Sequence, residues 1–184
     1  MRMSPAERRE TFERLFRNTR TDLLAYLLRR STNPEDAADV LAQVYVIAWQ
    51  KVEAVPPGDQ ARPWLFGVAR NLLLKAWSRR RSAETLAHRL AAELRDAGRL
   101  VHSPEPAATA IRQALASLPE IDREIVTLTA WEGLTPRQIA VVVGRSPNVV
   151  RVRLHRARAR LRRDLGPLAA VESGLAVEAT GHNH

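Results

Sequence analysis

The clearest chemical signal in the sequence is a run of arginines near its C-terminal end. Residues 144–161 read GRSPNVVRVRLHRARARL, with six arginines and no acidic residue. Guanidinium groups are permanently charged and bind phosphates and base edges. Like charges four residues apart on a helix repel by about 0.2–0.5 kcal/mol, and the pairs 156/160 and 158/162 are so placed. We therefore predict a polyanionic partner; the alternative is a solvated helix whose cations favour the negative C-terminal end.

A second basic segment lies earlier in the chain, which has a net charge of +9. Residues 62–82 carry six basic and no acidic groups, and residues 134–184 carry nine and three. Residues 1–61 are balanced at nine each, whereas residues 83–133 carry five basic and eight acidic groups. Two basic segments that flank an acidic one predict two polyanion-binding surfaces.

Composition excludes several other classes of chemistry. The sequence has no cysteine, and its five histidines show no ligand spacing beyond the pair His182 and His184, so we expect no metal and no cofactor. No nucleophile with a base and an orienting partner forms an identifiable motif, so we expect no enzyme. No apolar run of 18 residues occurs and the N-terminus is charged. We therefore expect a cytoplasmic protein with no membrane contact.

Apolar residues recur with helical periodicity almost throughout, which predicts an all-α fold. A first helix is expected over residues 5–30. A second begins with Asn33 as its cap and Pro34 as its first residue, and a third begins near Pro63, the last residue of the helix-breaking segment VPPGDQARP. Further helices follow from about residue 108 and over 120–132. Three tryptophans at helical spacing are expected in the core: Trp49, Trp64 and Trp131. For Trp77, core packing and contact with a partner both remain open.

The arginine-rich segment has the capping and turn residues of a helix-turn-helix motif. Thr135 can cap a short helix with Gln138 three residues on, and Gly144 suits a left-handed turn. Ser146 and Pro147 then start a second helix. Its predicted buried stripe is Val150, Leu154, Ala157 and Leu161. Its opposite face begins with the side chains expected to reach base edges in a major groove, Asn148, Arg151, Val152 and His155.

With both halves described, the chain resembles the extracytoplasmic-function (ECF) sigma factors of the sigma-70 family. DAADVLAQVYVIAW (36–49) with RPWLFGVARNLLLKAWSRRR (62–81) resembles region 2. LPEIDREIVTLTAWEGLTPRQIAVVVGRSPNVVRVRLHRARARLR (118–162) resembles region 4. The resemblance implies two small helical domains: region 2, a three- or four-helix bundle, at 1–82, and region 4 at 108–166. Residues 83–107 would be a linker and residues 167–184 a C-terminal tail.

The resemblance implies a function without chemistry of its own: binding core RNA polymerase and directing it to promoters. Region 2 of the family docks on the clamp helices of the largest subunit, and region 4 meets the flap of the second-largest subunit. The polymerase-binding positions would be Asp39, Gln43 and Tyr45. Many members also have an inhibitor, an anti-sigma factor.

The resemblance also implies two promoter-binding sites. Region 2 would open the −10 element and hold a flipped base in a pocket formed by loop 54–62 and Arg62. The adjoining DNA would lie along Arg70, Asn71, Lys75, Arg79 and Arg80. Region 4 would read the −35 element as a duplex through Thr135, Arg137, Arg145, Ser146, Asn148, Val149, Arg151, Val152, His155 and Arg156.

The sequence departs from the family pattern in both regions. Ala42 and Gln43 stand where a Gln and a Glu are common, and Val149 and Val152 replace a threonine and a serine. The valines lose hydroxyl groups but present methyl groups that can touch thymine. Two other functions remain open: a free-standing helix-turn-helix regulator whose residues 1–100 sense a ligand or dimerise, and an enzyme such as a recombinase.

Overall fold

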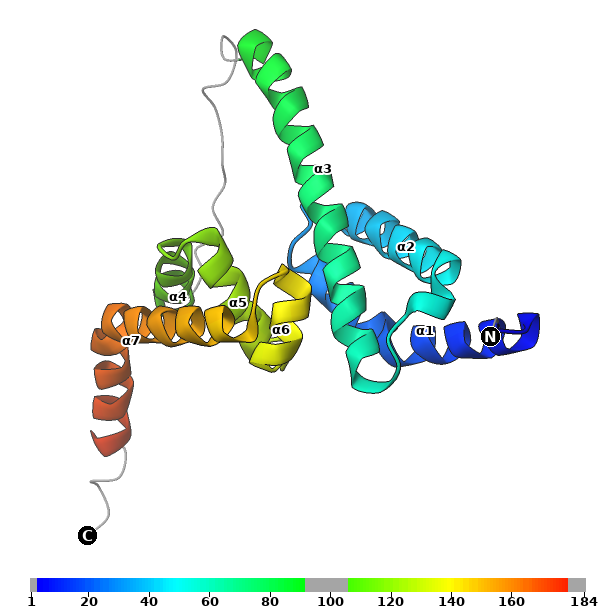
Figure 1. Cartoon of the computed structure of the whole chain (residues 1–184). Helices are drawn as coiled ribbons and strands as arrows, with labels where there is room; N and C mark the ends of the chain where they lie inside the picture. Colours follow the sequence, from blue (N-terminus) through cyan, green and yellow to red (C-terminus); the bar gives the residue numbers. More distant parts are fainter. Residues whose placement is uncertain (1–2, 92–105, 179–184) are drawn as a thin grey trace. The chain divides into compact units, whose positions relative to one another are not determined.

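The computed structural model describes residues 3–91 and 106–178, and side chains within 3–79 and 110–166. Figure 1 shows the helices in chain order: α1 Pro5–Leu28, α2 Pro34–Gln50, α3 Ala61–Ala91, α4 Pro106–Ala116, α5 Glu120–Ala130, α6 Pro136–Val143 and α7 Pro147–Glu178. Two 3₁₀ turns, η1 Val52–Ala54 and η2 Gly58–Gln60, fill the predicted break between α2 and α3. The described residues contain no strand, so the prediction of an all-α fold is confirmed.

The chain forms two compact units. Unit 1 comprises Met1–Ala97 with Leu134–Ser146, and unit 2 comprises Gly98–Gly133 with Pro147–His184. Helices α1, α2 and α3 therefore belong to unit 1, and α4, α5 and α7 belong to unit 2. Helix α6 packs against α3 and is grouped with unit 1.

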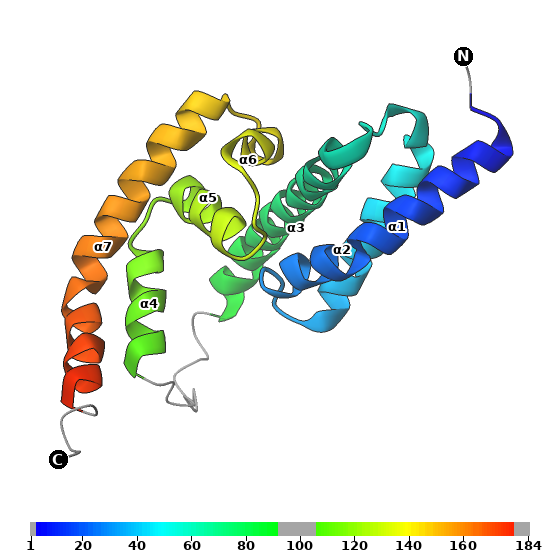
Figure 2. The same ribbon diagram turned by 90° about the horizontal axis from the view of Figure 1, so that it is seen from below.

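The core of unit 1 forms where α1, α2 and α3 meet (Figure 2). Its largest buried side chains include Tyr26 and Phe66, whose rings pack edge to face with centroids 5.0 Å apart. Phe66 is buried beside Leu65 and Ala69; because both α1 and α2 cover α3, this helix buries a wider arc than one neighbour would require. Leu24 and Leu28 of α1 are exposed.

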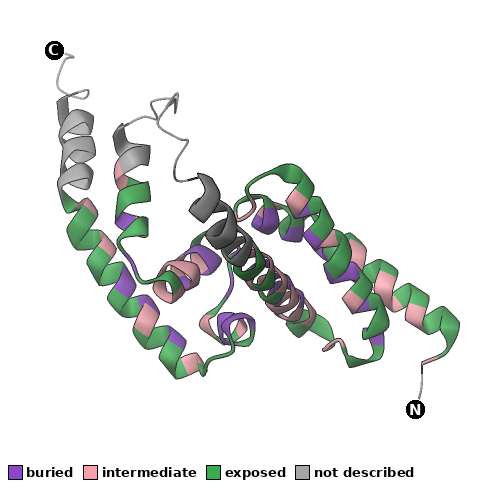
Figure 3. Cartoon of the chain, turned by 90° about the horizontal axis from the view of Figure 1, so that it is seen from above, coloured by how far each residue is buried: buried purple, intermediate pink, exposed green. Residues whose placement is uncertain are grey.

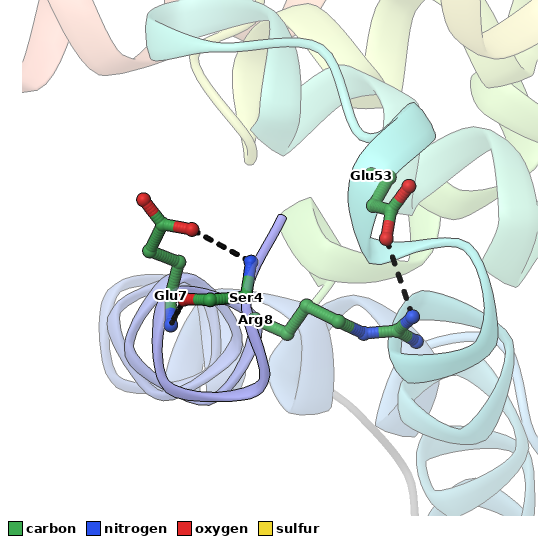
Figure 4. A network of polar contacts seen from close by, with 4 residues as sticks. All are labelled: Ser4, Glu7, Arg8 and Glu53. Carbon is green, nitrogen blue, oxygen red and sulfur yellow. Dashed lines mark hydrogen bonds and ion pairs between the residues drawn. The ribbon is translucent and has the colours of Figure 1, made fainter. Parts of the chain in front are cut away.

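Side-chain hydrogen bonds cap the starts of two helices of unit 1. Asn33 accepts a hydrogen bond from the backbone N–H of Asp36 at 2.7 Å, which confirms it as the cap of α2. At the start of α1, the Ser4 hydroxyl accepts from the Glu7 N–H while the Glu7 carboxylate accepts from the Ser4 N–H (Figure 4). In the same figure Arg8 reaches Glu53 at 3.3 Å, which ties α1 to η1.

In unit 2, α4 and α5 pack against α7. Three of the four residues of the predicted stripe, Val150, Leu154 and Ala157, are buried, and Leu161 is half-buried. Figure 3 shows buried and exposed residues alternating along α7, as expected for a helix that packs on one side. The helix continues to Glu178, well beyond residue 166, where the second domain was expected to end.

The tryptophan prediction is wrong for two of its three residues. Trp49 is 42% exposed and Trp131 is 54% exposed. Each stands at a helix end beside the packed positions, which Ala48 and Leu128 occupy. Trp64 is half-buried, as is Trp77.

Candidate nucleic-acid interface

The predicted helix-turn-helix segment has the local geometry that its sequence requires. The Thr135 hydroxyl accepts from the Gln138 N–H at 3.3 Å, and the Gln138 side chain accepts from the Thr135 N–H at 2.9 Å. Gly144 follows α6 with φ of 65°, a left-handed conformation that side chains with a Cβ rarely adopt. The chain therefore ends α6, turns within three residues and starts α7 at Pro147.

The first turns of α7 present the predicted contact residues to solvent. All of those on α7 are exposed: Asn148, Val149, Arg151, Val152, His155 and Arg156. Since the buried stripe starts at Val150, the predicted face and the packed face of this helix are separate. The remaining predicted contacts of this region are exposed in unit 1, on α6 and on the turns at either end of it: Thr135, Arg137, Arg145 and Ser146.

Two side chains of this face are bonded to each other. The Arg151 Nη1 donates to Asn148 Oδ1 at 2.6 Å. Residues three apart are neighbours on a helix, and both side chains are exposed, so this contact needs no other element to form. The sequence predicted both residues as separate base contacts and missed their pairing.

One arginine of α7 has a structural partner instead. Arg153 Nη1 lies 2.8 Å from Asp122 Oδ1, and the Asp122 side chain is largely buried. This ion pair ties α7 to α5. Arg153 is one of the six arginines of segment 144–161, for which a polyanionic partner was predicted. Its position three residues after the buried Val150 is the signal that it lies at the edge of the packed face.

Helix α3 carries the second set of predicted contacts. Asn71, Lys75 and Arg79 are exposed at intervals of four residues, so they form one row along the helix. Arg70 is half-buried. The side chain of Arg80 lies outside the described side chains, so its predicted contact stays a prediction.

Arg62, at the start of α3, is held by an acid. Its Nε and Nη2 lie 3.0 and 2.9 Å from the same carboxylate oxygen of Asp22 on α1, and its guanidinium lies 5.1 Å from the centre of the Phe66 ring. The sequence predicted Arg62 as a pocket residue and did not predict Asp22 as its partner.

A cavity of about 650 Å³ opens beside Arg62. The loop after α2 lines it with Pro56 and Asp59, and α1 adds polar side chains from Thr11 and Asn18. This volume is within the roughly 300–1,000 Å³ of small-molecule pockets. The sequence placed a pocket at loop 54–62 but missed the contribution of α1, which no local motif indicates.

The predicted polymerase-binding residues of α2 are not on one face. Asp39 and Gln43 are exposed on the same side, with the exposed Val46 one turn further on. Tyr45 points into unit 1, where its hydroxyl lies 2.9 Å from the Thr19 hydroxyl and its ring packs against Phe16. Burial raises the pKa of the Tyr45 phenol. Because it is only 6% exposed, Tyr45 belongs to the core rather than to a contact surface, which corrects the sequence-based assignment.

Two features are absent from the described residues. Within 3–91 and 106–178, no three His, Cys, Asp or Glu side chains are grouped as metal ligands would be. Over the same residues, no helix combines the length and apolar character that a membrane span requires.

Known protein families match both the N-terminal and the C-terminal half of the chain. The family model described as Sigma-70 region 2 matches residues 15–83, and that described as Sigma-70, region 4 matches residues 108–161. Among curated proteins, the ECF RNA polymerase sigma factor SigL of Mycobacterium tuberculosis is 32% identical over 155 residues, which cover 79% of this chain and 84% of SigL. The "Probable RNA polymerase sigma factor RfaY" of Xanthomonas campestris pv. campestris is 32% identical over 156 residues, but the chain spans only 38% of its length.

Solved structures give the same fold. The sigma factor RpoE in its complex with the anti-sigma factor NepR from Bartonella quintana superposes with a TM-score of 0.60 over 84% of this chain and 96% of RpoE, at 22% identity. CnrH, in complex with the cytosolic domain of CnrY, gives 0.57 over 85% of this chain and 88% of CnrH, at 26% identity. The chain belongs to the sigma-70 family, in its ECF group. It is an alternative sigma factor, which binds core RNA polymerase and directs promoter-specific initiation of transcription.

Proposed function

We propose that the exposed face at the start of α7 reads the −35 element as duplex DNA, through the six predicted residues that this helix carries. The observation that carries this proposal is the separation of the two faces of α7. Val150, Leu154 and Ala157 are buried, while the opposite side exposes arginines without an acidic residue in the first turn. The positive end of the helix dipole adds to their attraction for phosphates.

Unit 1 opens and holds the −10 element in this proposal. The row Asn71, Lys75 and Arg79 on α3 follows the backbone of the melted strand, and the predicted contacts of Arg70 and Arg80 are part of the same proposal. The cavity next to Arg62 receives one extruded base, since its volume suffices and Thr11 and Asn18 offer hydrogen-bonding groups. Arg62, Thr11 and Asn18 line this one hollow, which supports an extruded base of a single strand as its ligand rather than an intact duplex.

Asp39 and Gln43 on the exposed side of α2 bind the clamp helices of the largest polymerase subunit, and unit 2 meets the flap of the second-largest subunit. Tyr45 contributes by packing under this surface. The chain has no catalytic role of its own, and it works in the cytoplasm, where its polymerase partner transcribes. The bound partners of the RpoE and CnrH structures support an anti-sigma factor as a further partner.

The deciding experiment is transcription by core polymerase supplied with this chain. The chain is added to core polymerase, and transcripts are sequenced from a promoter library. We expect discrete start sites that share two spaced upstream elements. The double variant Asp39→Asn, Gln43→Ala should bind core polymerase more weakly, whereas Glu13→Gln, an exposed acid on α1, should not. Tight binding to a palindromic duplex without polymerase, and no transcripts with it, would instead support a free-standing regulator.

A further inference from the structure

The bonded pair Asn148 and Arg151 changes what the start of α7 can recognise. Arginine has N–H groups only and always donates. Asparagine is usually suited to adenine, because its Oδ1 accepts from the N6 amino group while its Nδ2 donates to N7. In this structure the Asn148 Oδ1 already accepts from Arg151 at 2.6 Å. The groups that remain for DNA are the amide N–H groups of Asn148 and the other N–H groups of Arg151, all of them donors.

From this geometry we infer that Asn148 and Arg151 act as one donor-only unit that selects guanine within the −35 element and rejects adenine. The inference rests on the proposed function of α7 and specifies its sequence preference. Guanine presents two acceptors in the major groove, N7 and O6, whereas adenine presents one acceptor and the N6 amino donor. Of the two purines, only guanine matches a pair that has donors alone, and it offers two acceptors where thymine offers one, O4.

A second lone pair on Asn148 Oδ1 does not restore adenine recognition. A carbonyl oxygen can accept twice, so an amino group can in principle approach it. That approach would bring the N–H dipoles of adenine N6 next to the positive guanidinium of Arg151, which is an unfavourable arrangement of like partial charges. The guanine O6 at the same place is attracted by that charge.

The valines beside the pair do not supply the missing acceptor. The first turn of α7 contains no acidic residue, and Val149 and Val152, both exposed beside the pair, have no polar atoms in their side chains. Both members of the pair are exposed at the start of α7, where a recognition helix contacts base edges.

The test is a selection of promoters randomised through the −35 element, using the full chain with core polymerase. We expect one position at which guanine is enriched about five- to hundredfold over adenine, the range of one good bidentate contact. Inosine at that position should bind like guanine, because it keeps N7 and O6 and loses only the minor-groove amino group. Enrichment of adenine in the wild-type selection, or loss of binding with inosine, would overturn the inference.

Two substitutions separate base reading from simple charge. Arg151→Ala frees the Asn148 oxygen, so the preferred base should change from guanine to adenine. Asn148→Ala should keep guanine but reduce the discrimination. Arg158→Ala, which removes an exposed arginine further along α7, should weaken binding equally for all sequences. If Arg151→Ala acts like Arg158→Ala and flattens the salt dependence, then Arg151 contacts a phosphate and the inference is wrong.

The same selection distinguishes this inference from the proposed function. A wild-type −35 preference that none of the substitutions changes would disprove the guanine unit and leave the sigma-factor assignment intact. If the chain forms no active complex with polymerase, the proposed residue roles fail first. The selection is then repeated with the full chain alone on duplex DNA, where a switch from guanine to adenine in Arg151→Ala supports the unit and an unchanged preference refutes it.

Discussion

The two basic surfaces hold their cations in different ways. In unit 1, Arg62 is bound to Asp22 by two contacts of about 3 Å, and Arg8 lies 3.3 Å from Glu53. At the start of α7, Arg151 is instead bonded to a neutral amide, and the nearest firm ion pair of that helix, between Arg153 and Asp122, lies at the edge of its packed face. In the proposed function Arg62 would therefore exchange an acid for DNA, whereas Arg151 keeps its full charge available.

This difference indicates two modes of binding. Exchanging Asp22 for a phosphate costs the energy of the existing ion pair. Contact at Arg62 is therefore favourable only when a further interaction compensates, such as a base that enters the adjoining cavity. A cation bonded to a neutral partner attracts duplex DNA from the first encounter. Initial binding is thus expected from unit 2, and strand capture from unit 1.

The largest expected effect tests whether the two surfaces rest on independent cores. Phe66→Ala removes a fully buried ring from unit 1 and should lower its free energy of unfolding by about 3–5 kcal/mol. Ile125→Ala, which removes a fully buried side chain from unit 2, should cost about 2–5 kcal/mol there. Hydrogen exchange should show faster exchange in α1–α3 for the first variant and in α5 and α7 for the second. Equal loss of protection in both units would contradict independent cores.

The exchange at Arg62 predicts opposite effects for its two partners. Arg62→Ala should reduce open-complex formation about tenfold, because a hydrogen bond from a charged group contributes about 1.5–3 kcal/mol. Asp22→Asn leaves Arg62 without its opposing charge and should increase open complexes by about two- to threefold. Permanganate reactivity of unpaired thymines measures both. Equal decreases, accompanied by equal losses of thermal stability, would mean that the pair is structural only.

Salt dependence should distinguish a melted strand at unit 1 from a duplex at α7. Each lost phosphate contact lowers the slope of log K against log salt by about 0.7 for single strands and about 0.9 for duplex DNA. We expect the smaller change for Lys75→Ala or Arg79→Ala in open-complex formation, and the larger for Arg156→Ala in −35 duplex binding. Arg9→Ala, an exposed cation of α1, is the control with no expected change.

The smallest effect concerns the ion pair between α5 and α7. Arg153→Ala should lower the free energy of unfolding of unit 2 by less than about 1 kcal/mol, since the Arg153 side chain is 41% exposed. The base preference at −35 should not change. A double variant with Asp122→Ala should be no less stable than either single variant, as measured by chemical denaturation. A change in base preference would show that Arg153 reaches DNA.

Local patterns in the sequence were sufficient for the helices and their ends. The caps at Asn33 and Thr135 and the turn at Gly144 depend on a few adjacent residues, and all three are confirmed. The buried stripe of α7 could also be predicted, because one helix face packs on one side. The burial of Phe66 and the exposure of Trp49 could not, since they depend on which neighbouring helices cover each arc.

For the candidate site too, local features could be predicted from the sequence and pairings between distant residues could not. Residue types and periodicity were enough to predict the exposed face of α7. Pairings between distant residues, such as Arg62 with Asp22 or Arg153 with Asp122, were missed because no spacing along the chain encodes them. Tyr45 was assigned to a surface from its resemblance alone, and its place on the inner side of α2 overrides that assignment.

The bond between Asn148 and Arg151 joins two side chains of a single helix, and both are exposed to solvent. Substitution at either position leaves the interior of unit 2 unaltered. If the pair reads the −35 element as proposed, evolution could retarget this protein to a different set of genes by changing two codons, without first having to acquire compensating mutations that preserve folding.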